Sequence, residues 1–292
     1  MTDHPRRLQS YLSGHWQAGQ GEGSPLHDAA TGEVVAHVGS DGLDLAGALE
    51  YGRRAGGEAL RAMTFHERAL MLKALALELT QHKDAFYAES LRTGATKIDG
   101  MVDIDGGIGT LFVYASKGRR ELPNATLLLD GPPEGLSKDN TFSAQHVLTP
   151  LTGVALHINA FNFPVWGMLE KLAPNLLAGM PAIVKPASQT AYLTEMVARV
   201  MIDSGILPEG AVQIVCGGVG DMLDHVTGQD VVTFTGSAST GRMLKAHPRI
   251  VAESARFSME ADSLNSAILG PDAEPGSPEF DLFVKEVHRE MT

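Results

Sequence analysis

Residues 231–241 read VVTFTGSASTG, a stretch that predicts a buried strand turning through glycine into a helix. The strand is the β-branched and aromatic run from Val231 to Phe234, and the helix begins near Ser239. A strand that turns into a helix start gathers backbone N–H groups and the positive end of the helix dipole at one place. Phosphate groups bind at such places, and Ser237 can add a hydroxyl donor. An ordinary strand–helix turn is the alternative, since neither GxGxxG nor GxxxxGKS/T is present.

Three more strand–helix units precede this stretch, and the four units together predict a parallel sheet with right-handed crossovers. We therefore expect an α/β fold in which helices flank the sheet. The expected strands cover residues 154–158, 182–184, 212–215 and 231–234, and the expected helices follow at 165–177, 191–204, 220–227 and from 239 onward.

Polar or small residues follow each of these four strands. They are Asn159–Asn162, Lys185–Ser188, Cys216–Gly218 and Thr235–Ser237. The carboxyl ends of parallel strands meet at one edge of a sheet, where ligands of open α/β folds bind. Four such strand ends at one edge favour a nucleotide site there.

The N-terminal part predicts a small hairpin or meander followed by helices. Short extended runs between glycines in residues 10–40 indicate the meander, and Leu43–Ala62 is helical in composition but interrupted by glycines. Thr64 begins a capping box, so a helix starts directly after it. Two further helices are expected at residues 84–93 and 98–117, with Gly118 ending the second.

Residues 123–149 change character, because prolines and glycines surround two extended runs, Thr126–Leu129 and Thr141–Leu148. The two runs form either an extended arm that packs on another subunit or a plain hairpin. The pattern leaves both interpretations open.

The composition excludes several classes of protein. Hydrophobic residues make up 43% of the 292 residues and charged residues 20%, which is typical of a globular protein with a core. The net charge of −12 argues against nucleic acid or an anionic membrane as the main partner. One cysteine, no signal-peptide pattern and no long apolar run indicate a cytoplasmic protein. The 11 histidines show no metal-ligand spacing, so no metal site is expected.

Four motifs resemble, in order and spacing, the aldehyde dehydrogenase superfamily. They are NAFNFP at 159–164, KPA at 185–187, FTGS at 234–237 and ME at 259–260, supported by EADSLN at 260–265. In detail the chain is similar to the aldehyde dehydrogenase part of the bifunctional phenylacetate-degradation proteins, and secondly to the semialdehyde dehydrogenases of the benzoyl-CoA epoxidation pathway. The resemblance covers the whole chain and implies a Rossmann-like sheet with an oligomerisation arm.

The resemblance implies two catalytic residues. Asn162 would donate its side-chain amide to the oxyanion of a thiohemiacetal, although a cap of the helix near Val165 is the alternative role of an asparagine here. Glu260 would act as the general base that activates the deacylating water, and a plain surface glutamate is its alternative.

The resemblance also implies a dinucleotide site. Lys185 would bind ribose hydroxyls, Gly236 and Ser237 would hold the pyrophosphate, and Gly241 would allow a close approach at the helix start. The full set of expected cofactor-binding residues is Ile158, Asn159, Lys185, Ser188, Gly217, Phe234, Gly236, Ser237 and Gly241.

One departure from the family concerns the choice of dinucleotide. The family often has glutamate three residues after the cofactor lysine, and Ser188 stands there in this chain. A carboxylate would repel a 2′-phosphate, whereas a hydroxyl can donate to one. We therefore expect NADP, with NAD as the alternative.

A second departure is the nucleophile. The family's catalytic cysteine follows the general base in a Gly-Gln-x-Cys-like run, which this chain lacks, and we expect Cys216 to be packed and inert. The chain thus resembles a truncated product. The expected division is residues 1–122 and 150–264 for the cofactor domain, 123–149 for the arm and 265–292 for the start of a catalytic domain.

Two functions follow from these patterns, and a third class stays open. The first is NADP-dependent oxidation of an aldehyde, of the ring-opened CoA-thioester semialdehyde type, by a homo-oligomeric enzyme. The second is dinucleotide binding without turnover, because no nucleophile is present. The third is an unrelated doubly wound protein that acts as a structural or interaction partner.

Overall fold

The computed structural model describes residues 6–262 and 266–291. The chain divides into two compact units, residues 1–260 and 261–292. Residues 263–265 of the EADSLN motif, and with them the expected boundary after residue 264, lie outside the described residues.

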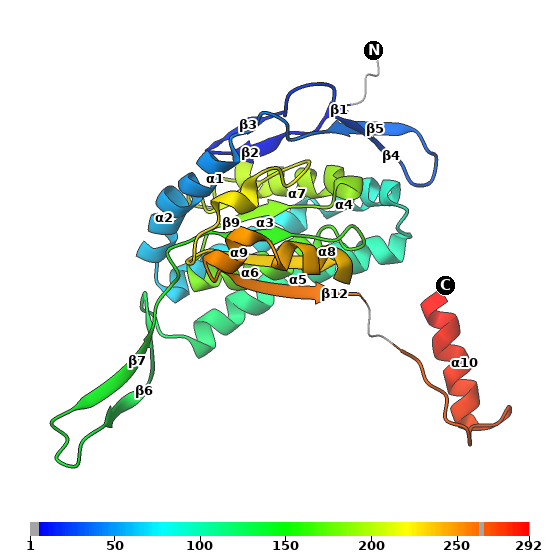
Figure 1. Ribbon diagram of the computed structural model, residues 1–292. Helices are drawn as coiled ribbons and strands as arrows, with labels where there is room; N and C mark the ends of the chain where they lie inside the picture. Colours follow the sequence, from blue (N-terminus) through cyan, green and yellow to red (C-terminus); the bar gives the residue numbers. More distant parts are fainter. Residues whose placement is uncertain (1–5, 263–265, 292) are drawn as a thin grey trace. The chain divides into compact units, whose positions relative to one another are not determined.

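A seven-stranded sheet forms the centre of the first unit, in the order β12-β11-β8-β9-β10-β2-β3 (Figure 1). Its four inner strands β11, β8, β9 and β10 are parallel, which confirms the expected α/β fold. The pair β2–β3 adds to β10 in the antiparallel sense. The strands are β2 (Ser10–Leu12), β3 (His15–Gln17), β8 (Ala155–Ile158), β9 (Ala182–Lys185), β10 (Val212–Ile214), β11 (Val231–Gly236) and β12 (Arg256–Ala261).

The strand order reverses at β8. From β8 the chain moves outward through β9 and β10, then returns to place β11 on the other side of β8. Such a reversal leaves a crevice outside the carboxyl ends of the two strands that flank it, where ligands of open α/β sheets bind. The expected strand ends after β8 and β11 therefore lie at the switch point of the sheet.

Helices cover both faces of this sheet, because alternate residues of each buried strand point to opposite sides. Ala155, Ala182 and Val184 pack with the long helices, whereas Leu156 and Ile183 pack on the opposite side with α1 and α9. The helices of the first unit are α1 (Leu45–Tyr51), α2 (Gly57–Ala62), α3 (Phe65–Gln81), α4 (Lys83–Ser90), α5 (Lys97–Glu121), α6 (Trp166–Ala178), α7 (Ala191–Asp203), α8 (Ala238–Lys245) and α9 (Pro248–Ala252).

Several local predictions are confirmed. The capping box at Thr64 is present, since its hydroxyl accepts from Glu67 N and its own N–H donates to the Glu67 carboxylate. The expected meander comprises β2–β3 and a three-stranded sheet of β1 (Arg6–Arg7), β5 (Val34–Val38) and β4 (Ser24–His27).

The prediction that Gly118 ends a helix was wrong, because α5 continues to Glu121. Gly118 is buried where α5 meets its neighbours, and a Cβ there would lie 2.6 Å from Leu177 and 3.0 Å from Ala69. The glycine therefore permits close packing of the last turn of α5 against Leu177 and Ala69. The expected helix 220–227 is also wrong, since only a short 3-10 turn, Met222–His225, forms there.

The two expected runs in residues 123–149 form a separate antiparallel pair, β6 (Leu128–Gly135) and β7 (Ser143–Leu148). β6 runs through Gly131, Pro132 and Pro133, which were expected to form a loop, and its pairing with β7 is irregular there. Every residue of β7 is exposed.

The second unit contains helix α10 (Pro278–Met291). No helix among the described residues combines the length and the apolar character that crossing a bilayer requires.

Candidate active site

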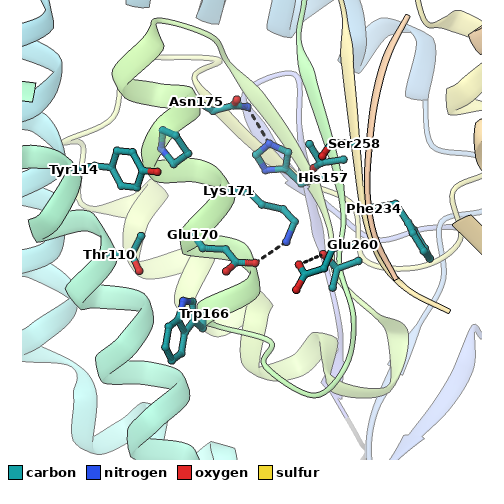
Figure 2. A pocket seen from close by; sticks show the side chains of 13 residues that line it. Thr110, Tyr114, His157, Trp166, Glu170, Lys171, Asn175, Phe234, Ser258 and Glu260 are labelled. Atoms are coloured by element: carbon teal, nitrogen blue, oxygen red, sulfur yellow. Dashed lines mark hydrogen bonds and ion pairs between the residues drawn. The ribbon is translucent and has the colours of Figure 1, made fainter. Parts of the chain in front are cut away.

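Two adjoining pockets, of about 470 and 300 Å³, lie beside α6 in the first unit. They share four lining residues, Trp166, Glu170, Thr235 and Glu260, and we call these four residues the neck. Figure 2 shows the larger pocket, with side chains from α5, α6, β8, β11 and β12 around it. The smaller pocket is completed by Ala160, Asn162, Phe163 and Gly167.

Helix α6 begins at the smaller pocket, and another helix provides its cap. The Asp103 carboxylate of α5 accepts from Val165 N at 3.2 Å and from Trp166 N at 2.7 Å. The alternative role of Asn162 as the cap of this helix is therefore wrong. With that role filled by Asp103, the exposed Asn162 is left to line the pocket.

The surroundings of Asp103 have two opposing effects on the pKa of its carboxyl group. Burial raises the pKa of its carboxyl group from 3.8 to about 6, while the backbone N–H groups of Trp166 and Val165 oppose this shift. Burial dominates because an ionised carboxylate loses more hydration energy than these two donors restore.

Glu260 lies on β12 and lines both pockets. The hydroxyl of Thr235, on the neighbouring strand β11, donates to its carboxylate at 3.2 Å. The two residues expected to be catalytic, Asn162 and Glu260, thus line one pocket although 98 positions separate them in the chain. A neutral donor and a carboxylate in one pocket can stabilise an oxyanion and accept a proton from water.

Glu170 and Lys171 also line the site and were missed by the sequence analysis. Lys171 Nζ lies 2.8 Å from the Glu170 carboxylate and 3.3 Å from the carbonyl oxygen of Gly167. The sequence does contain a pattern that points to them, because these two charged residues interrupt a mostly apolar helix. They also lie four and five positions after Trp166, on the side of α6 that faces the pocket.

His157 of β8 is a third residue that was missed. It is fully buried against the larger pocket, and its Nε2 lies 2.9 Å from the Asn175 amide nitrogen. Burial, with Lys171 adding a smaller effect, lowers the pKa of His157 from 6.5 to about 3, so the ring is neutral. The ring Nδ1 and the Thr233 hydroxyl have no hydrogen-bond partner among the described residues. A histidine inside an apolar strand was the available signal.

Three expected cofactor residues lie side by side at the carboxyl edge of the sheet. Ile158 pairs in register with Lys185 on one side and Phe234 on the other. Ile158 and Phe234 are buried. Burial lowers the pKa of the Lys185 ammonium group, and no described residue forms a hydrogen bond or an ion pair with it. An unpartnered, half-buried ammonium group is suited to an anionic or hydroxyl-bearing ligand.

Three more of the expected cofactor-binding residues are Asn159, Ser188 and Gly217. Ser188 is half-buried in a 3-10 turn three residues after Lys185. Asn159 is buried, and neither atom of its amide has a partner among the described residues. Gly217 is buried against the backbone of Gly39 and Ser40.

Gly236 and Ser237 lie at the turn from β11 into α8, and Gly241 lies in the first turn of α8. Ser237 caps α8, and its hydroxyl accepts from Thr240 N at 3.3 Å. Gly241 is buried, and a Cβ there would meet Met259 Sδ at 2.2 Å. The predicted strand, turn and helix start are confirmed, and Ser237 has a structural role as a cap.

Cys216 lies at the end of β10, is fully buried and lines neither pocket. Burial raises the pKa of its thiol far above the ordinary value. The residue therefore lacks both the access and the thiolate character of a nucleophile. Within residues 6–262 and 266–291, no group of three or more possible metal ligands is found.

Comparisons with known proteins agree with this architecture. A model of the aldehyde dehydrogenase family matches residues 16–278. The chain is 54% identical over 288 residues to the 3,4-dehydroadipyl-CoA semialdehyde dehydrogenase of Aromatoleum evansii, covering 98% of this chain and 56% of that protein. It is 28% identical over 268 residues to a benzaldehyde dehydrogenase of Pseudomonas putida, covering 90% of this chain and 52% of that protein.

Solved structures share the fold. Lactaldehyde dehydrogenase from Escherichia coli superposes with a TM-score of 0.74 at 20% identity, covering 88% of this chain and 52% of that chain. A benzaldehyde dehydrogenase from Corynebacterium glutamicum gives 0.73 at 21% identity, covering 87% and 54%. The chain spans about half the length of the curated relatives it matches.

Proposed function

The chain belongs to the aldehyde dehydrogenase family, and from this premise we propose that it serves the NADP-dependent oxidation of an aldehyde to a carboxylic acid. The observation that supports this function best is the shared pocket of Asn162 and Glu260. It lies beside the switch point of the sheet, and the pocket brings together an oxyanion donor and a base.

In this proposal the two residues act at different stages. The Asn162 amide donates to the carbonyl oxygen of the substrate as that oxygen gains negative charge. The Glu260 carboxylate accepts a proton from the water molecule that releases the acid. The hydrogen bond from Thr235 keeps the Glu260 carboxylate facing the neck of the pockets.

The residues at the carboxyl edge fit a dinucleotide. Lys185, whose ammonium group has no partner among the described residues, would bind ribose hydroxyls, and the turn from β11 into α8 would face the pyrophosphate. A bound nicotinamide would supply an acceptor for the hydride. Ser188, rather than a carboxylate, stands three residues after Lys185, which supports NADP over NAD.

For the substrate, we propose a semialdehyde that carries a CoA thioester. The relative from Aromatoleum evansii is named for such a substrate, 3,4-dehydroadipyl-CoA semialdehyde. Its 54% identity extends over 98% of this chain.

The arm, the domain division and the cellular location belong to the same proposal. We assign residues 1–122 and 150–264 to the cofactor domain, 123–149 to an arm that packs on a second copy, and 265–292 to the start of a catalytic domain. The exposed strand β7 supports the arm. A reduced, buried Cys216 is compatible with the cytoplasm.

Dinucleotide binding without turnover is the second candidate for this 292-residue chain. It rests on the position of Cys216, the single cysteine, which is buried away from both pockets. Titration of the chain with NADP and NAD tests the proposal, and we expect saturable binding with NADP preferred. Absence of binding by both dinucleotides would refute it, and aldehyde oxidation that is lost in Cys216→Ser would refute the second candidate.

A further inference from the structure

The charges that line the two pockets are unbalanced. Among the described residues that line them, Glu170 and Glu260 are acidic, Lys171 is the one lysine or arginine, and His157 is neutral. Lys171 is already paired with Glu170 at 2.8 Å. The smaller pocket, which holds Asn162, is lined by both carboxylates and, among the described residues, by no lysine or arginine.

Glu170 is the acidic residue of α6 that lines both pockets. It belongs to both pockets, and 38% of its side chain is exposed although it lies in the neck. Figure 2 shows Glu170 and Lys171 of α6 pointing toward the same space as Glu260 of β12. A group bound in either pocket therefore lies near the Glu170 side chain.

We propose that Glu170 determines specificity by excluding aldehydes whose far end is a free carboxylate and admitting those whose acid is esterified. This inference rests on the proposed function and refines its substrate class. A free carboxylate would enter a space lined by two acidic side chains, and like charges repel more strongly where water is partly excluded. A thioester has the same carbon skeleton without the charge, so it escapes this penalty.

The charge of Glu170 need not serve the chemistry itself, because Glu260 already supplies the base in the proposed reaction. Lys171 moderates the effect by neutralising part of the Glu170 charge. Glu170 and Lys171 together thus set how strongly the site prefers a thioester to a free carboxylate. Removing Glu170 should weaken it, and removing Lys171 should strengthen it.

The experiment uses the 292-residue chain loaded with NADP and two matched probes. The probes are 4-oxopentanoate and its S-methyl thioester, in which a methyl ketone replaces the aldehyde. Trp166 lines both pockets, and the chain contains two tryptophans, so a Trp16→Phe background makes Trp166 fluorescence a reporter of the site. NADP binding is measured first on every sample.

We expect the thioester to bind about tenfold more tightly than the carboxylate when Glu170 is present, and nearly equally in Glu170→Gln. Lys171→Met should widen the preference. Glu121→Gln is the matched control, because Glu121 is also paired with a lysine, Lys117 at 3.2 Å, but lines neither pocket. Without any substitution, raising the salt concentration should narrow the preference by screening the repulsion.

The outcomes separate the two proposals. If no sample binds NADP or NAD, the proposed function fails. If NADP binds but Glu170→Gln keeps the full preference for the thioester, the role of Glu170 is refuted while the proposed function stands. Failure of both probes to bind the NADP-loaded chain also refutes the role of Glu170.

Discussion

The Asp103 carboxylate of α5 accepts the backbone N–H of Trp166, the first residue of α6, at 2.7 Å across 63 positions of sequence. A side chain from one helix thus caps the helix that forms one wall of both pockets. The orientation of Trp166 and Glu170 depends on this contact, because the cap fixes where the first turn of α6 begins.

Asp103 should make the protein less stable as the pH rises. Its pKa in the folded protein, about 6, lies above the ordinary 3.8, so its stabilising contribution is complete below pH 3.8 and is lost as the pH rises through 6. The free energy of unfolding of the wild type, relative to Asp103→Asn, should fall by about 3 kcal/mol between pH 3.8 and pH 7. Urea unfolding at several pH values measures this difference. The exposed Asp84→Asn serves as control, and a pH-independent difference for Asp103→Asn would contradict the prediction.

His157 should make the protein less stable as the pH falls. Its pKa in the folded protein, about 3, lies below the ordinary 6.5, so its contribution is complete above pH 6.5 and is lost as the pH falls. Between pH 6.5 and pH 4 the wild type should lose about 3 kcal/mol relative to His157→Gln. The same urea series, extended to His157→Gln, provides the measurement. Equal acid sensitivity of the two proteins would show that the ring is accessible to protons in the folded state.

Gly106→Ala should displace Trp166 and narrow both pockets. A Cβ at Gly106 would lie 2.5 Å from the Trp166 ring, so the ring must move. We expect a loss of about 1–3 kcal/mol in stability and a shift of the tryptophan emission. Gly109→Ala is the matched control on the same helix, since a Cβ there meets nothing within 4 Å. Gly109→Ala should instead stabilise α5 by about 0.5–1 kcal/mol, and equal effects of both substitutions would count against a packing role for Gly106.

Lys185→Met should lower the affinity for both dinucleotides, whereas Ser188→Glu should change the preference between NADP and NAD. Loss of the Lys185 ammonium group should weaken NADP and NAD alike, by about tenfold, because it removes a charge-assisted contact to the ribose. Ser188→Glu should weaken NADP more than NAD by about tenfold, because a carboxylate repels the 2′-phosphate. Fluorescence titration of each variant with both dinucleotides gives the ratios. An unchanged ratio in Ser188→Glu would place the 2′-phosphate elsewhere.

Cys216 should be unreactive in the folded chain. It is fully buried, and the raised pKa of its thiol keeps it protonated at neutral pH. A dithiobis-nitrobenzoate assay should detect almost no thiol in the native protein and one thiol per chain after unfolding. Cys216→Ser should leave NADP binding unchanged. Rapid labelling of the native protein would contradict the prediction.

The sequence predicted much of the framework because the signals were local. Strand–glycine–helix patterns identified the four parallel strands, and the capping box at Thr64 marked the start of α3. The prediction at Gly118 failed because it depended on neighbours in space. Gly118 was taken as the end of a helix because its intrinsic helix propensity is poor, but the close contacts of α5 with Leu177 and Ala69 favour a residue without a side chain.

The sequence by itself determined the α/β class, the order of the strand ends and the family to which the chain belongs, because strand and helix periodicity and short motifs are properties of contiguous residues. Only the tertiary structure decided that Asp103 caps α6 and that Glu170, Lys171 and His157 share a site with Glu260. Those relationships join elements far apart in the chain, and their energies come from burial and charge proximity that exist only once the sheet and its helices have packed together.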